Sequence, residues 1–168
     1  MSPKIRVGLL AFVLSLGLDL LSKHLIETNL QYGDMKPIIE GFFYLTHVRN
    51  PGAAFGLFRT APEQLRLFFF IAVSLVAVVI ILSFFRRLAP GDRLSATALG
   101  CILGGAVGNL IDRIRYHEVV DFLHFQLWSG YSWPDFNLAD SFIVIGVGLL
   151  VIELVASEGE NRAPSEPG

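Results

Sequence analysis

Four long apolar stretches constrain this chain more than any other feature of its sequence. A helix that spans the hydrocarbon core of a bilayer needs about 20 mostly apolar residues. Four windows meet that requirement, at residues 6–26, 66–86, 95–115 and 138–156. Of the 168 residues 53% are hydrophobic and 17% charged, which is too apolar for a soluble domain of this length. The sequence therefore predicts an all-α membrane protein with four transmembrane helices.

The basic residues predict which side of the membrane each loop faces. Lys and Arg near the ends of spans favour the cytoplasm. They gather at the N-terminus and between the second and third spans, at Lys4, Arg6, Arg86, Arg87 and Arg93. We therefore expect both termini inside and two segments outside, residues 27–65 and 116–137. Arg113 and Arg115 lie on the outer side against this rule, which leaves a functional role and irregular topology both open.

The composition of the first outer segment favours a small strand and loop region. Turn residues such as Gly33, Gly41 and Asn50-Pro51-Gly52 alternate there with short apolar runs. The apolar stretch Ala53 to Phe58 fits either a short interfacial element on the membrane surface or an ordinary packed loop.

The second outer segment and the C-terminus complete the predicted organisation. Trp128, Tyr131 and Trp133 are typical of an aromatic belt at the membrane interface. Residues 157–168 are small and polar, so we expect a disordered cytoplasmic tail behind a single domain of residues 1–156.

Ionisable residues inside the predicted spans need a partner or a purpose, because each costs about 2.5–3.5 kcal/mol at a helix centre on insertion scales. Asp19 and Lys23 lie four residues apart near the outer end of the first span, on the same helix face. They form either a self-neutralising pair or a support for a nearby site.

The third span combines a packing face with a polar end. Glycine recurs in it at Gly100, Gly104 and Gly108, a spacing that lets a neighbouring backbone approach closely. Asn109, Asp112 and Arg113 then share a face of its last turns. This cluster fits equally an Asp112–Arg113 ion pair and a site that holds a peptide backbone or a lipid head group.

Two acids flank the second outer segment. Asp140 begins the fourth span, where Asn137 can act as N-cap and the helix dipole favours an acid. Asp121 lies between Val120 and Phe122, and such apolar surroundings raise the pKa of a carboxyl group. Two carboxylates that share one proton are the arrangement of aspartic proteases. The spacing alone does not show that these two meet.

Three other readings of the polar residues compete with an acid pair. A transporter could line a polar path with Asp19, Lys23 and Asp112, although these charges gather at the outer ends of the spans. A Ser/Lys protease could use Lys23 with Ser22 or Ser141, although adjacent Ser22 cannot share a helix face with Lys23. The third reading, metal-dependent hydrolysis, would need histidines at metal-ligand spacing. That spacing is absent from His24, His47, His117 and His124, and we expect these histidines at surfaces or interfaces.

Five blocks of the sequence resemble the lipoprotein signal peptidases, also called type II signal peptidases, over nearly the whole chain. The blocks are Asp19-Leu-Leu-Ser-Lys23, Asn50-Pro-Gly-Ala-Ala-Phe55, Gly104-Gly-Ala-Val-Gly-Asn109-Leu-Ile-Asp112-Arg113, Val120-Asp121-Phe122 and Phe136-Asn137-Leu-Ala-Asp140-Ser141. Pro51 departs from the family, which commonly has Thr there.

The resemblance implies roles for single residues. Asp121 and Asp140 match the catalytic aspartates of the family. The expected substrate-binding or supporting residues are Asp19, Lys23, Asn50, Asn109, Asp112, Arg113 and Asn137.

The resemblance also implies an activity and a location. We expect an aspartic endopeptidase of the bacterial inner membrane, with its active site near the outer face. It would cut diacylglyceryl-modified prolipoproteins just before the lipidated cysteine. Its partners would be these substrates, membrane lipids and the inhibitor globomycin. No metal, organic cofactor or nucleic acid is implied, a net charge of −2 offers nucleic acid no basic face, and we expect a monomer.

Overall fold

The computed structural model describes residues 1–52, 61–128 and 130–162. Four of its helices are long and apolar enough to span a membrane, so this is a multi-pass membrane protein. They are α1 (Pro3–Asn29), α2 (Glu63–Arg87), α3 (Arg93–Tyr116) and α4 (Leu138–Arg162). The four predicted spans are confirmed, and each lies within one helix. The predicted interfacial element at Ala53–Phe58 lies outside the described residues.

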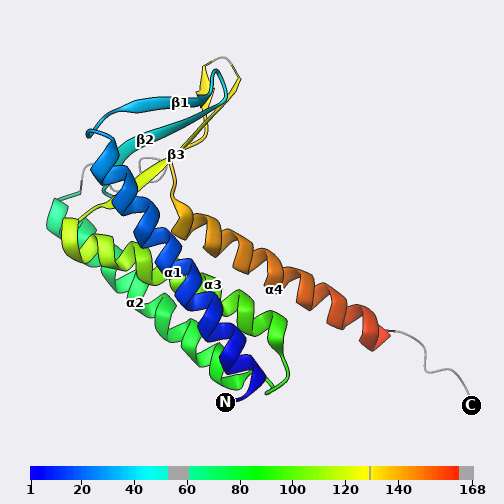
Figure 1. The fold of residues 1–168 in the computed structure, drawn as a ribbon. Coiled ribbons are helices and arrows are strands. Elements are labelled where there is room, and N and C mark those ends of the chain that lie inside the picture. Colours follow the sequence, from blue (N-terminus) through cyan, green and yellow to red (C-terminus); the bar gives the residue numbers. More distant parts are fainter. Residues whose placement is uncertain (53–60, 129, 163–168) are drawn as a thin grey trace, which may run out of the picture.

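Helix α3 lies at the centre of the bundle and contacts each of the other three helices (Figure 1). Half of its most apolar stretch is buried by protein, against 6–17% for the other helices. Its glycines explain this position. A Cβ atom added at Gly100, Gly104 or Gly108 would overlap atoms of α1, and one at Gly105 would overlap the carbonyl oxygen of Ala139 in α4. The predicted close approach along the glycine face is confirmed, and the approaching backbone is that of α1.

A small antiparallel sheet covers the end of the bundle opposite the N-terminus and the end of α4 (Figure 1). Its strands are, in spatial order, β1 (Met35–Ile39), β2 (Phe43–Asn50), β3 (Val119–Trp128) and β4 (Tyr131–Ser132). The pair of β1 and β2 confirms the strands expected in the first outer segment. Strand β3 was not predicted, because its run Val119 to Phe122 is buried throughout and so lacks the polar–apolar alternation of a half-exposed strand.

The start of β3 is held directly against the helices. His117 ends α3 in the left-handed conformation, with φ 63°, and its N–H donates to the carbonyl oxygen of Arg113 at 3.1 Å. Val120 and Phe122 then pack with Ile26 of α1 in a small apolar core. Successive side chains of a strand point to opposite faces. Asp121 therefore points away from this core.

Helix α4 runs past residue 156, where we expected the domain to end. The expected disorder from residue 157 is wrong up to Arg162, which is still helical. The first proline after the span is Pro164, so no residue before it forces the helix to stop. The domain limit and the disorder of residues 163–168 stay predictions, since that end lies outside the described part of the chain.

Candidate active site

Asp121 lies in β3 with its carboxyl group shielded from solvent, the residue being 2% exposed. Its Oδ1 accepts a hydrogen bond from Asn137 Nδ2 at 2.7 Å, and its Oδ2 accepts one from Asn50 Nδ2 at 2.9 Å. Burial raises the pKa of Asp121 to about 7, helped by the nearby charge of Asp140 and opposed by the two amides and by Lys23. The raised pKa expected from the apolar neighbours is confirmed.

Asp140 lies in the first turn of α4 and forms a capping box with Asn137. The Asp140 backbone N–H donates to Asn137 Oδ1 at 3.0 Å, and the Asn137 N–H donates to Asp140 Oδ2 at 3.3 Å. The remaining carboxylate oxygen, Oδ1, accepts from Asn109 Nδ2 at 2.8 Å. The predicted N-cap is confirmed, and the partial positive charge of the helix N-terminus favours a negative charge on Asp140.

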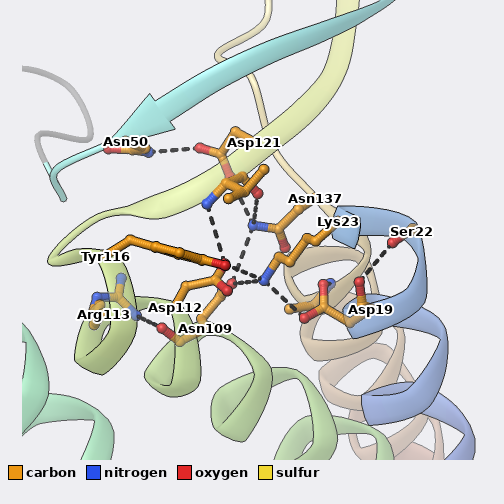
Figure 2. A network of polar contacts seen from close by, with 12 residues as sticks. Asp19, Ser22, Lys23, Asn50, Asn109, Asp112, Arg113, Tyr116, Asp121 and Asn137 are labelled. Carbon is orange, nitrogen blue, oxygen red and sulfur yellow. Dashed lines mark hydrogen bonds and ion pairs between the residues drawn. The ribbon is translucent and has the colours of Figure 1, made fainter. Parts of the chain in front are cut away.

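Two asparagines join the two acids into one hydrogen-bonded chain. Asn137 Nδ2 donates to Asn109 Oδ1 at 3.2 Å, in addition to its bond with Asp121. The path from Asp121 to Asp140 thus runs through Asn137 and Asn109, with every member partly or fully buried. Figure 2 shows Asn50 and Asp121 of the sheet, Asn109 of α3 and Asn137, which precedes α4, converging on one another. The sequence left open whether the acids meet, and the fold brings them into one site.

A buried ion cluster between α1 and α3 adjoins this chain of hydrogen bonds at Asn109 (Figure 2). Lys23 Nζ lies 2.8 Å from Asp19 Oδ2, 2.9 Å from Asp112 Oδ2 and 2.9 Å from Asn109 Oδ1. Asp19 Oδ1 in turn accepts from the backbone N–H of Ala139 at 2.9 Å, which holds the first turn of α4 against α1. The Asp19–Lys23 pair both neutralises itself and supports the site.

Asp112 and Arg113 do not form the simple pair that we considered. Asp112 makes its ion pair with Lys23 and also accepts the backbone N–H of Val120 at 3.2 Å. The Arg113 guanidinium carbon lies 5.4 Å from the ring centre of Phe70, and the guanidinium interacts electrostatically with Asp140 and Asp121. The two side chains diverge because Lys23 draws Asp112 toward α1, so Arg113 is left facing the acids.

Asn50 is oriented by the turn that follows β2. Its Oδ1 accepts from the backbone N–H of Gly52 at 2.9 Å, so its NH₂ group is directed at Asp121. Gly52 has φ +90°, and a Cβ atom there would overlap the ring of Phe70. The turn therefore requires glycine at residue 52 and tolerates proline at residue 51.

The sheet carries a second polar cluster that sequence reasoning missed. His124 Nδ1 hydrogen-bonds Asp135 Oδ1, and Thr46 Oγ1 donates to Asp135 Oδ2 at 3.2 Å. The cluster ties β2 and β3 to the segment before Asn137, and no local pattern marks residues so far apart. We expected His47 at a surface or an interface, and it is 6% exposed. It is buried because its Nδ1 hydrogen-bonds the Leu30 carbonyl oxygen at the end of α1.

The geometry disfavours the competing readings. Lys23, Asp19 and Asp112 pair with one another and are at most 3% exposed, so they do not line an open path. Ser22 Oγ donates to the carbonyl oxygen of Asp19, and Ser141 Oγ to that of Asn137. Neither hydroxyl is directed to Lys23 as a nucleophile would be.

A hollow opens beside Asp140 along the first turns of α4. It has a volume of about 400 Å³ and is mostly apolar; its lining residues are Trp133, Phe136, Asp140, Ser141, Val144 and Ile145. One of the two acids is therefore accessible from an apolar surface rather than only from water.

Comparison with known proteins agrees with this geometry. The family described as signal peptidase (SPase) II matches residues 11–156. A lipoprotein signal peptidase of Syntrophotalea carbinolica is 46% identical over 88% of this chain and 89% of its own length. One of Geobacter sulfurreducens is 43% identical over 98% of this chain and 100% of its own length. A solved bacterial membrane enzyme superposes with a TM-score of 0.82 at 32% identity, over 98% of this chain and 96% of that one.

Proposed function

The chain belongs to the signal peptidase II family, and we propose that its catalytic groups are the carboxyls of Asp121 and Asp140. As a member of that family it is a peptidase that removes the signal peptide from prolipoproteins in the membrane. The aspartic mechanism is supported above all by one observation. The two acids lie in a single buried chain of hydrogen bonds, and Asp121 has a pKa of about 7.

The chemistry that this pair can perform is acid–base hydrolysis of a peptide bond. Two neighbouring carboxyls share one proton, so that one accepts a proton from the attacking water while the other donates one to the scissile carbonyl oxygen. Asn50, Asn109 and Asn137 hold the two groups in place through the bonds described above. Arg113 offsets their negative charge. No step requires a metal or an organic cofactor.

The substrate reaches this pair from the bilayer. We propose that it carries a diacylglyceryl group on the cysteine just after the cleaved bond, and that the apolar hollow beside Asp140 admits it. The basic residues at the helix ends opposite the sheet support an orientation with both termini in the cytoplasm. The sheet and the site then face the outer side of a bacterial inner membrane. Inhibition by globomycin and a monomeric state stay predictions from the family.

The first test is cleavage of a diacylglyceryl-modified prolipoprotein by the purified protein in detergent. We expect Asp121→Asn and Asp140→Asn each to lower the rate by about 10²–10⁴-fold, the usual loss of a general acid or base. Exposed Asp34, whose carboxylate accepts from the backbone of its own turn, provides the control Asp34→Asn, which keeps full activity. Thermal unfolding confirms that each variant is folded. Near-full activity of either folded site variant would show that its aspartate is not catalytic.

A further inference from the structure

The amide of Asn109 lies between a group that can only donate hydrogen bonds and a group that accepts them. Lys23 Nζ lies 2.9 Å from its Oδ1, and Asp140 Oδ1 lies 2.8 Å from its Nδ2. An ammonium has no acceptor and an ionised carboxylate has no donor. Only one orientation of the amide therefore satisfies both neighbours. The reverse orientation would place the NH₂ group against the ammonium and the oxygen against the carboxylate.

We propose that Lys23 is a positioning residue that locks the Asn109 amide toward Asp140, so that Asp140 is the ionised member of the pair and Asp121 is the member that holds the proton. The inference rests on the proposed function of the two acids and adds to it. It states which acid acts as the base and names the residue that decides this. Lys23 itself is 3% exposed and donates to neither acid of the pair, so it acts on Asp140 through Asn109.

The surroundings of the two acids differ in the way this division requires. Asp140 receives the Asn109 NH₂ group, the Asn137 N–H and the N-terminus of α4, and it faces the Arg113 guanidinium of α3. Each of these favours a negative charge. Asp121 is a residue of β3, and the burial of its carboxyl group raises its pKa to about 7. A protonated carboxyl keeps acceptor lone pairs on both oxygens, so it still accepts from Asn50 and Asn137.

Lys23 is held in place by acids of two helices. Asp19 of α1 and Asp112 of α3 lie at 2.8 and 2.9 Å from its Nζ. A buried charge without a partner is costly, so these acids hold the Lys23 side chain in place, directed at Asn109. The charged groups around Asp140 are thus Asp121 from β3, Arg113 and Asp112 from α3, and the Asp19–Lys23 pair from α1.

The resulting reaction balances. Asp140 takes a proton from water, the water oxygen attacks the scissile carbonyl carbon, and the carbonyl oxygen takes the proton of Asp121. The tetrahedral intermediate then loses the amine as the C–N bond breaks. The amine nitrogen receives the proton from Asp140, and one hydroxyl of the intermediate returns a proton to Asp121. Both acids end in their starting states.

The experiment compares the wild type with Lys23→Met and with the double variant Lys23→Met/Asp112→Asn, which removes one charge of each sign and leaves an Asn oxygen to accept from Val120. We expect kcat to fall about 10- to 100-fold, as when the outer partner of a reacting group is lost. KM should be unchanged, because the buried lysine does not contact the substrate. The acidic limb of the pH–kcat profile should move toward neutral pH, because Asp140 has lost its fixed donor.

Ser15→Ala is the matched control, because Ser15 lies two turns earlier in α1, is 1% exposed and donates to the carbonyl oxygens of Ala11 and Phe12 in its own helix. We expect its pH–kcat profile to match that of the wild type. A purely structural role of Lys23 would lower the amount of active enzyme at every pH and leave the limb in place, which would overturn the inference. An unchanged kcat would overturn it too.

The same series separates this inference from the proposed function. If Asp121→Asn and Asp140→Asn are inactive while the folded Lys23 variants keep the wild-type kcat and profile, the acid pair stands and only the role of Lys23 fails. If either aspartate variant stays active, the acid pair itself fails. If Lys23→Met does not fold, the role of Lys23 is judged from kcat and the pH–kcat profile of the double variant.

Discussion

Asp121 has surroundings that differ strongly from those of an aspartate in water. Burial raises its pKa from 3.8 to about 7, so the folded state binds a proton that the unfolded state has already lost between these values. The contribution of this group to stability is full below about pH 4 and is lost as the pH rises through about 7. The buried Asp121 carboxyl group thus lowers stability at neutral pH.

This loss is measurable. We predict that Asp121→Asn gains stability relative to the wild type as the pH rises from 4 to 7, and that the gain levels off above that range. The asparagine has no charge to desolvate, so it lacks the dependence. The measurement is the thermal unfolding midpoint of both proteins in detergent across that range, with Asp34→Asn as control. A difference between the two proteins that does not vary with pH would contradict the raised pKa.

At the scale of helices, the position of the site depends on how closely α3 approaches its neighbours. Gly108 leaves room for the Asp19 carboxylate, and Gly105 leaves room for the carbonyl of Ala139 next to Asp140. A side chain at either residue would push α1 or α4 away from α3. The glycine face therefore sets the distances that join Lys23, Asn109 and Asp140.

A pair of glycine variants tests this packing. Gly104→Ala should destabilise the protein by about 1–3 kcal/mol, because its Cβ would overlap Ser15 and the α1 backbone, and overpacked sites lose that much. Gly17→Ala, which meets nothing within 4 Å, should instead stabilise α1 by about 0.5–1 kcal/mol. The measurement is the free energy of unfolding by denaturant in mixed micelles. Equal effects of the two would mean that α3 does not approach α1 closely.

At the scale of the whole molecule, the sheet lies at one end of the bundle, and the N-terminus and the end of α4 lie at the other (Figure 1). Whichever side of the membrane the sheet faces therefore also contains the site, and the loop between α2 and α3 lies on the other side. The orientation proposed from the basic residues places the sheet outside.

Labelling of introduced cysteines tests that orientation. Cys101 is the only natural cysteine, so it is first replaced by serine. We predict that Glu40→Cys, exposed beside the sheet, reacts with a membrane-impermeant maleimide in intact spheroplasts of an expressing bacterium. Gly91→Cys, in the loop before α3, should react only after the membrane is opened. The reverse pattern would place the site in the cytoplasm.

The sequence by itself determined the features that depend on local chemistry. Apolar windows of membrane-spanning length defined the four helices, and glycine spacing marked the packing face of α3. Apolar neighbours marked Asp121 as a group with a raised pKa, and Asn137 followed by Asp140 marked a helix start. The resemblance of five blocks to one family then indicated residues such as Asn50, whose role no local pattern reveals.

Only the tertiary structure decided which of these groups meet. Asp112 could pair with Arg113 one residue away, yet it pairs with Lys23 of another helix, because the α3 glycines bring α1 within reach. Asp121 and Asp140 share a site because β3 starts at the end of α3 and pairs through Leu123 with Phe136, close to the start of α4, where Asn137 spans the gap. Spacing along the chain does not encode such distances, since they depend on how several elements pack at once.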